Sequence, residues 1–225
     1  MMEARVKDNQ QWGEKMPHVM IVDAYPIWRQ GIRSTISIQE DFEVVLESVE
    51  EHEIGSVISR GDADIVILDL DIPGGNGLDI LRLIKGLDPD LPVLILSALA
   101  EEVYGVIALK EGASGYLTKG CTPEQLLTAV RKVSQGKKYI SDQLAQRLAR
   151  YVQSGDQALP HERLTMRQFQ VMLMLGQGMT PKEVSEKLSL SYTTVTTHKS
   201  RILSKMELES VAQIVKYVST EGLAK

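Results

Sequence analysis

Short apolar runs alternate with helical patterns over the first two thirds of the chain. Five runs have the length of β-strands: residues 19–22 (VMIV), 42–48 (FEVVLES), 65–70 (IVILDL), 93–97 (VLILS) and 115–119 (GYLTK). Several are apolar without alternation, which is typical of strands buried on both faces of a parallel sheet. Helical periodicity fills the gaps, over residues 26–38, 50–59, 78–87, 101–110 and 123–135. These β–α units predict an α/β domain with a doubly wound, five-stranded parallel sheet.

Beyond residue 140 every pattern is helical. Residues 141–152 predict one further helix, and residues 154–163 (SGDQALPHER) are rich in turn formers and predict a linker. Capping boxes at Thr165 and Thr180 then open two short helices, and Ser191 caps a longer one. A last helix follows over residues 210–218. Two short helices, a tight turn and a longer third helix predict an all-α, four-helix domain of the helix-turn-helix type.

The charge distribution supports this division. Residues 160–225 hold 9 Lys and Arg against 6 Asp and Glu, a net of +3, whereas residues 1–159 carry a net of −8. A basic second domain can meet an anionic partner. We therefore expect a flexible N-terminal extension (1–17), a first domain (18–138), a helix with a linker (139–163) and a basic helix-turn-helix domain (164–225).

Composition indicates the class of protein and the cellular compartment. Hydrophobic residues make up 43% of the chain and charged residues 24%, as in an ordinary globular protein. No apolar run approaches the roughly 18 residues of a membrane span, and residues 1–17 show no signal-peptide pattern. Cys121 stands alone and cannot form an internal disulfide. We expect a cytoplasmic protein without a membrane partner.

Polar side chains stand at the ends of four predicted strands. Asp23, Asp69, Ser97 and Lys119 follow or end the first, third, fourth and fifth strands. The carboxyl ends of parallel strands lie at one edge of the sheet, so these groups should converge on one cleft. Two carboxylates can hold a hard divalent cation such as Mg²⁺, and the backbone at Asp71 could complete its shell. With a lysine and a hydroxyl, the set suits phosphoryl transfer to a carboxylate.

The first domain resembles the receiver domain of bacterial response regulators, which has a flavodoxin-like fold. The segments that carry the resemblance are IVDAYP (21–26), ILDLDIPGGNG (67–77), LSA (96–98) and GASGYLTK (112–119). The resemblance implies that Asp69 accepts phosphate from a histidine kinase. It implies that Ser97 and Lys119 contact the phosphoryl group and that Tyr116 is an aromatic switch.

One departure from the receiver pattern affects the metal site. The family normally has two adjacent acids after the first strand, and the second usually binds the metal. Here the pair is Asp23 and Ala24, and Tyr25 replaces a histidine that is common in the closest branch. We expect Mg²⁺, held by Asp23, Asp69 and Asp71, to bind more weakly than in a typical receiver.

Residues 164–218 resemble the LuxR-type helix-turn-helix domain. The matching segment begins LTMRQFQVMLMLGQGMTPKEVSEKLSLSYTTVTTHKSRIL, and its departures are Met166, Gln168 and Gln170. Together the two resemblances identify the chain as a member of the NarL/FixJ branch. They imply double-stranded DNA as a partner and a homodimer as the binding form.

The third helix of this domain carries the predicted DNA-reading face. Val195 and Ile202 form part of an apolar stripe, while Thr193, Thr197 and Ser200 share the other side at helical spacing. Short hydroxyls can enter a major groove, and lysines and arginines can reach phosphates. The predicted DNA-binding residues are Lys182, Thr193, Thr196, Thr197, Lys199, Ser200, Arg201 and Lys205.

The sequence thus predicts a transcription regulator in which phosphorylation of Asp69 controls dimerisation and DNA binding. A second hypothesis keeps DNA binding but drops phosphorylation, because Ala24 removes an acidic ligand. A third is an enzyme, since Asp69 and Asp71 match the motif that opens haloacid-dehalogenase-type phosphatases. That family needs a further acidic pair downstream, and after Lys119 the acids are only scattered. We therefore predict a regulator and not an enzyme.

Overall fold

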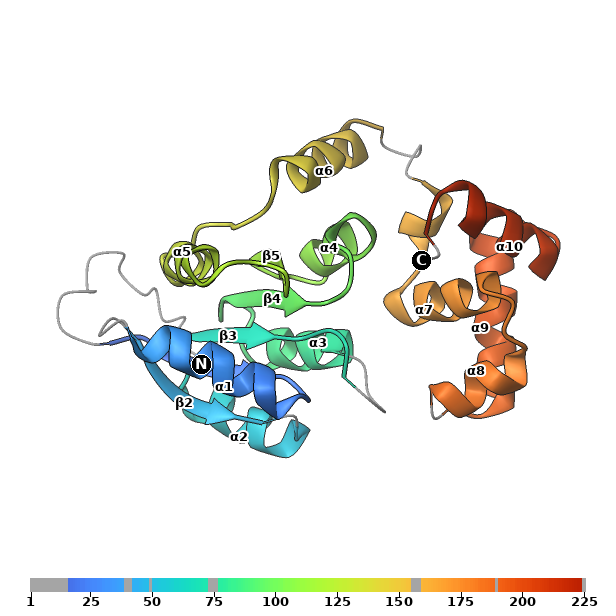
Figure 1. Cartoon of the computed structure of the whole chain (residues 1–225). Coiled ribbons are helices and arrows are strands. Elements are labelled where there is room, and N and C mark those ends of the chain that lie inside the picture. The colour runs from blue at the N-terminus through green and yellow to red at the C-terminus, as the bar shows by residue number, and fades with distance from the viewer. Residues whose placement is uncertain are drawn as a thin grey trace, which may run out of the picture.

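The computed structural model describes residues 16–38, 42–48, 50–72, 77–154, 159–188 and 190–223. Most of the predicted N-terminal extension, part of the linker and most of the PGGNG turn lie outside these residues. Figure 1 shows an α/β domain followed by a group of helices. The elements of the first domain are β1 (His18–Val22), α1 (Pro26–Ser37), β2 (Glu43–Glu47), α2 (Glu51–Arg60), β3 (Ile65–Leu68), α3 (Gly77–Leu87), β4 (Val93–Ser97), α4 (Glu101–Lys110), β5 (Gly115–Thr118) and α5 (Pro123–Ser134).

The five strands form one parallel sheet in the order β2-β1-β3-β4-β5. Every residue of β3 and β4 is buried, whereas β2, at the edge, is half-exposed. One side of the sheet packs under α1 and α5 through residues such as Ile36 and Val130. The other packs under α2, α3 and α4 through residues such as Ile54 and Leu81. The predicted doubly wound sheet is confirmed.

The register of the sheet sets the position of the polar strand ends. Val22 of β1 lies opposite Leu68 of β3, so the next residues in each strand leave the sheet side by side. In the same way Ser97 of β4 lies opposite Thr118 of β5. These pairings bring the carboxyl ends of four strands to one edge.

The remaining elements are α6 (Asp142–Ser154), the 3₁₀ turn η2 (Pro160–Arg163), α7 (Met166–Gly176), α8 (Pro181–Lys187), α9 (Tyr192–Lys205) and α10 (Val211–Thr220). The Thr165 and Thr180 hydroxyls accept hydrogen bonds from the backbone N–H groups of Gln168 and Glu183, which completes the predicted capping boxes. Ser191 caps α9 in a related way, by accepting from the backbone N–H of Thr194. These caps satisfy backbone donors that each helix leaves unpaired at its start.

The four C-terminal helices share a small core. Its buried residues include Phe169 of α7, Val195 and Ile202 of α9, and Val218 of α10. Gly176 lets α10 approach closely, because a Cβ at this position would lie 2.5 Å from Val218 Cγ2. The predicted all-α domain is therefore confirmed. Within the described residues no helix is long and apolar enough to span a membrane.

Helix α4 is covered on its outer side as well as by the sheet. Leu144 of α6 is buried over Gly105, where an added Cβ would lie 2.8 Å from its methyl groups. The Ser141 hydroxyl, just before α6, donates to the Glu101 carboxylate. The Tyr104 ring packs on Phe169 of α7. Helix α4 therefore meets both the linker helix and the C-terminal domain.

Candidate functional site

Four side chains meet at the carboxyl edge of the sheet. The Lys119 Nζ lies 2.6 Å from Asp23 Oδ2 and 2.7 Å from Asp69 Oδ2. The Ser97 hydroxyl donates to Asp69 Oδ1 at 2.6 Å, and the backbone N–H of Asp71 donates to the same oxygen at 3.0 Å. The structure thus brings together the four residues whose convergence the sequence predicts.

The backbone explains why these side chains converge. The N–H of Asp69 donates to the Val22 carbonyl, and the N–H of Lys119 donates to the Ser97 carbonyl. The parallel hydrogen-bond pattern therefore extends one residue past the end of β3 and of β5. The side chains of Asp69, Asp23 and Lys119 are 0%, 2% and 5% exposed. Two buried carboxylates thus share one ammonium. Because the site is shielded from water, the uncompensated negative charge favours the binding of a further cation.

The site retains some of the oxygen ligands that a divalent cation needs. Asp23 Oδ2 is buried and contacts the Lys119 ammonium, but it has no aligned hydrogen bond. Such an oxygen can still serve as a metal ligand. In the described part of the chain no three His, Cys, Asp or Glu side chains are grouped for metal binding. Asp23 and Asp69 thus offer two carboxylates to a divalent cation, one fewer than a pair of adjacent acids with Asp69 would provide.

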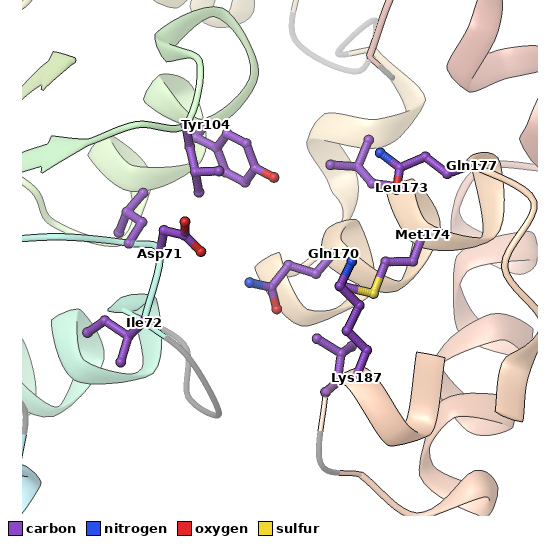
Figure 2. Close-up of a pocket in the computed structure, with 11 residues that line it drawn as sticks. Asp71, Ile72, Tyr104, Gln170, Leu173, Met174, Gln177 and Lys187 are labelled. Carbon is purple, nitrogen blue, oxygen red and sulfur yellow. The ribbon is translucent and has the colours of Figure 1, made fainter. Parts of the chain in front are cut away.

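Asp71 contributes differently from Asp23 and Asp69. Its backbone joins the cluster, but its side chain is exposed and lines a separate pocket. Figure 2 shows its carboxylate directed toward the C-terminal domain, beside Tyr104. The group of Asp71 that contacts the cluster is therefore its backbone N–H, which donates to Asp69 Oδ1.

Two aromatic rings that the sequence pattern does not predict at the site cover Lys119. The ring centroids of Tyr25 and Trp28 lie 5.4 and 5.1 Å from the Lys119 Nζ. Both residues follow Asp23 at the start of α1, and Ala24, between Asp23 and Tyr25, is half-buried. The sequence does place two aromatic residues within five positions of a strand-end acid. Periodicity, however, does not show where a ring points.

Tyr116, the predicted switch residue, lies inside the receiver. It is 1% exposed, and its hydroxyl donates to the Leu99 carbonyl at 2.9 Å. Burial, followed by the nearby charges of ionisable groups including Asp69, raises the pKa of this phenol. The ring is therefore neutral and held inward, next to the loop that follows Ser97.

A pocket of about 320 Å³ lies between the receiver and the C-terminal domain (Figure 2). Asp71, Ile72 and Tyr104 line one wall, and Gln170 and Lys187 belong to the other. Burial and the Asp71 charge raise the pKa of Tyr104 to about 12. The lining of the pocket includes Leu70, the residue directly after the buried Asp69, so the pocket adjoins the strand end that carries the carboxylate cluster.

Helix α9 carries the predicted DNA-reading residues. Thr193, Thr197 and Ser200 are exposed on it, while Thr196 and Lys199 are half-buried. The remaining predicted contacts, Lys182, Arg201 and Lys205, are exposed, and Lys205 Nζ donates to the Arg163 carbonyl at 3.2 Å. The structure thus gathers these residues on α8 and α9.

Helix α9 does not line the interdomain pocket, whose C-terminal wall comes from α7 and the end of α8. In Figure 1, α7 is the helix that faces the receiver, and α9 lies beyond it. In this arrangement the receiver therefore leaves the exposed threonines of α9 uncovered.

His198 of α9 was not singled out by the sequence. Its Nδ1 is buried and has no hydrogen-bond partner within the described residues. Burial and the charges of Arg167 and Arg201 lower the pKa of its imidazole. The ring is therefore neutral at physiological pH, beside two cations on the same domain.

Comparison with known proteins matches both halves of the chain. Residues 19–131 match the response regulator receiver domain, and residues 162–218 match the bacterial regulatory proteins of the luxR family. The nitrate/nitrite response regulator protein NarP of Escherichia coli (strain K12) is 32% identical over 207 residues, covering 91% of this chain and 95% of that protein. The oxygen regulatory protein NreC of Staphylococcus epidermidis is 32% identical over 213 residues, covering 91% and 98%.

The fold comparison agrees. RcsB from Salmonella enterica serovar Typhimurium, solved on a promoter with a phosphomimetic, matches with a TM-score of 0.64 at 23% identity, over 92% of this chain and 100% of that one. A receiver sheet joined to a LuxR-type helix-turn-helix defines a response regulator of a two-component system. This chain belongs to the NarL/FixJ family of such regulators, and it is a DNA-binding transcription regulator, which excludes the phosphatase hypothesis.

Proposed function

We propose that Asp69 is the phosphoacceptor and that a histidine kinase is the donor. The observation that carries the proposal is the Asp69 carboxylate held between the Lys119 ammonium and the Ser97 hydroxyl. A carboxylate oxygen attacks phosphorus, the bond from phosphorus to the donor imidazole breaks, and the imidazole nitrogen takes up a proton. Lys119 and Ser97 then bind the phosphoryl oxygens.

Magnesium fits this proposal with reduced affinity. Asp23, Asp69 and the backbone of Asp71 would hold the ion, whose charge neutralises the oxygens of the transferred group. Ala24 supplies no carboxylate. Fewer charged ligands give a weaker site for a hard cation, so Mg²⁺ binds more weakly here than in a receiver that has both acids.

At the other end of the chain, we propose that a homodimer binds double-stranded DNA with α9 in the major groove. Thr193, Thr196, Thr197, Lys199 and Ser200 lie on the helix that would read bases. Lys182, Arg201 and Lys205 are exposed and suited to phosphates. Two-fold dimers read repeated half-sites, so the preferred spacing is about 10 base pairs from centre to centre. A DNA partner implies a cytoplasmic location.

Ala24 favours a second candidate, in which the receiver regulates DNA binding without phosphorylation. The two candidates differ in one measurement, which is covalent labelling of the full-length chain by its kinase or by acetyl phosphate. Phosphorylation at Asp69 predicts a mass gain of one phosphoryl group that Asp69→Asn abolishes and Asp71→Asn retains. A wild type that never labels but still binds its operator supports the second candidate.

A further inference from the structure

The Lys119 ammonium is enclosed on several sides at once. Two carboxylate oxygens, one each from Asp23 and Asp69, lie 2.6 and 2.7 Å from Nζ. The Tyr25 and Trp28 rings lie over the same atom, with centroids at 5.4 and 5.1 Å. The face of an aromatic ring is electronegative and attracts a cation within about 6 Å of its centroid. All four groups therefore attract the ammonium to one position.

The backbone fixes the two rings over the site. The Tyr25 N–H donates to Asp23 Oδ1 at 2.7 Å, and the Trp28 N–H donates to the Tyr25 carbonyl at 3.0 Å. Arg29 Nη1 donates to the Asp23 carbonyl at 2.7 Å. Tyr25 and Trp28 are 42% and 40% exposed, so the rings form the outer wall of a site whose acids are buried. The wall is part of the same turn that presents Asp23.

The position of Lys119 affects the binding of a divalent metal ion. Its ammonium contacts Asp23 Oδ2 and Asp69 Oδ2, the carboxylates that a divalent ion would need. A cation held firmly at these oxygens competes with Mg²⁺ for them. It also supplies, without an ion, part of the positive charge that a phosphoryl group on Asp69 requires.

We propose that Tyr25 and Trp28 are positioning residues that cage Lys119 between Asp23 and Asp69 and thereby reduce the dependence of phosphoryl transfer on Mg²⁺. The cage compensates for the acid that Ala24 lacks, because the site then relies more on its own fixed cation. This inference rests on the proposed phosphorylation of Asp69.

The test measures the labelling rate of the full-length protein by acetyl phosphate, with EDTA and with saturating Mg²⁺. The ratio of the two rates is the magnesium stimulation. Trp28→Leu frees Lys119, so labelling without metal slows, while labelling at saturating Mg²⁺ changes less because the ion then supplies the positive charge. The stimulation therefore rises, by about two- to fivefold for a cation–π contact at a partly exposed site. Trp28→Phe keeps a ring face and retains most of the wild-type value.

Ile27 provides the matched control. It lies in the same turn, is 74% exposed and has no aromatic ring that could attract the Lys119 ammonium. Ile27→Ala therefore leaves the stimulation unchanged. If Trp28→Leu labels with the wild-type stimulation, or if Ile27→Ala raises it equally, the cage proposal is wrong. Loss of folding alone would lower both rates together and leave their ratio unaltered.

Fluorescence tests the cage without phosphorylation. In a Trp12→Phe background Trp28 is the only tryptophan, and Lys119→Met should change its emission because the charge beside the indole is removed. Lys138→Met, which removes a lysine that binds the Ala113 carbonyl instead, should not. Unchanged emission in Lys119→Met overturns the cage. A wild type that never labels overturns the phosphorylation proposal and with it the catalytic part of this inference.

Discussion

Tyr104 of α4 meets Phe169 of α7 edge to face, with ring centroids 5.6 Å apart and ring planes at 89°. This contact joins the receiver to the DNA-binding domain. Phe169 also packs near His161, whose Nδ1 is 2.7 Å from the Tyr217 hydroxyl of α10. A continuous row of rings therefore runs from α4 of the receiver to the last helix of the chain.

Tyr104→Leu should loosen the contact between the domains. Edge-to-face aromatic pairs contribute about 0.5–1.5 kcal/mol beyond the area they bury, so without the pair the two domains should spend more time out of contact. Small-angle scattering should report a larger radius of gyration. Tyr192→Leu, on the exposed start of α9, makes the same chemical change away from the contact and should leave the radius unaltered. An unchanged radius in Tyr104→Leu would mean that the ring pair does not hold the domains together.

Ala24→Asp should strengthen magnesium binding by roughly tenfold, since it adds a charged oxygen ligand next to Asp23. Labelling by a small phosphodonor at limiting Mg²⁺ should accelerate in parallel. Ala24→Asn has nearly the same shape without the charge, so it isolates the electrostatic effect. The explanation fails if Ala24→Asp and Ala24→Asn bind magnesium equally well.

Lys199→Ala and Lys182→Ala should affect DNA binding in different ways. Loss of a base contact costs about 1–3 kcal/mol and relaxes the preference at one position. Loss of a phosphate contact weakens binding to all sequences alike and reduces the salt slope by about one. We expect the first pattern for Lys199 and the second for Lys182, measured on specific and random duplexes at several salt concentrations. Lys216→Ala on α10 is the control.

If Lys199→Ala keeps the wild-type affinity and base preference, the groove-facing assignment of this side of α9 is wrong. If Lys182→Ala changes the base preference instead of the salt slope, the assignment of α8 to the phosphates is wrong.

His161 should make stability depend on pH. Burial, and then the Arg147 charge, lowers the pKa of its imidazole from 6.5 to about 4. The folded state therefore holds the neutral ring, and the stabilisation is complete above about pH 6.5. It is lost as the pH falls toward 4, because the unfolded chain binds the proton first, at a cost on the order of 3 kcal/mol.

Urea unfolding at pH 7 and pH 4.5 measures this effect. His161→Gln should lose less stability on acidification than the wild type, whereas His52→Gln, at an exposed position of α2, should behave as the wild type does. Equal losses in His161→Gln and wild type would show that this ring does not contribute to the acid sensitivity.

The sequence predicts the convergence of Asp23, Asp69, Ser97 and Lys119 because it depends on strand order and on the common edge of a parallel sheet. The side-chain directions at that edge are harder to predict. Asp71 directs its carboxylate to the pocket, and Tyr25 and Trp28 turn over Lys119. Local hydrogen bonds position the Tyr25 and Trp28 backbones, but the place of Lys119 beneath their rings depends on pairing between strands that are distant in sequence.

Helix α4 shows the same limit. Its residues are apolar nearly all round, and the sequence pattern alone does not say what covers the outer side. The structure shows Leu144 and Phe169 there. The TTVTT segment (193–197) illustrates the reverse case, because β-branched residues favour strands, yet the surrounding caps and packing hold it in α9.

The hydroxyls of α9 are already engaged with their own helix. Thr196 donates to the Thr193 carbonyl at 2.8 Å, Thr197 to the same carbonyl at 2.9 Å, and Ser200 to the Thr196 carbonyl at 3.1 Å. Because these hydroxyl protons are donated to carbonyls of the same helix, the threonines would present mainly methyl groups and oxygen lone pairs to a DNA groove. Such a surface complements the 5-methyl group of thymine and the amino groups of adenine and cytosine, so replacing thymine by uracil in the operator would weaken binding.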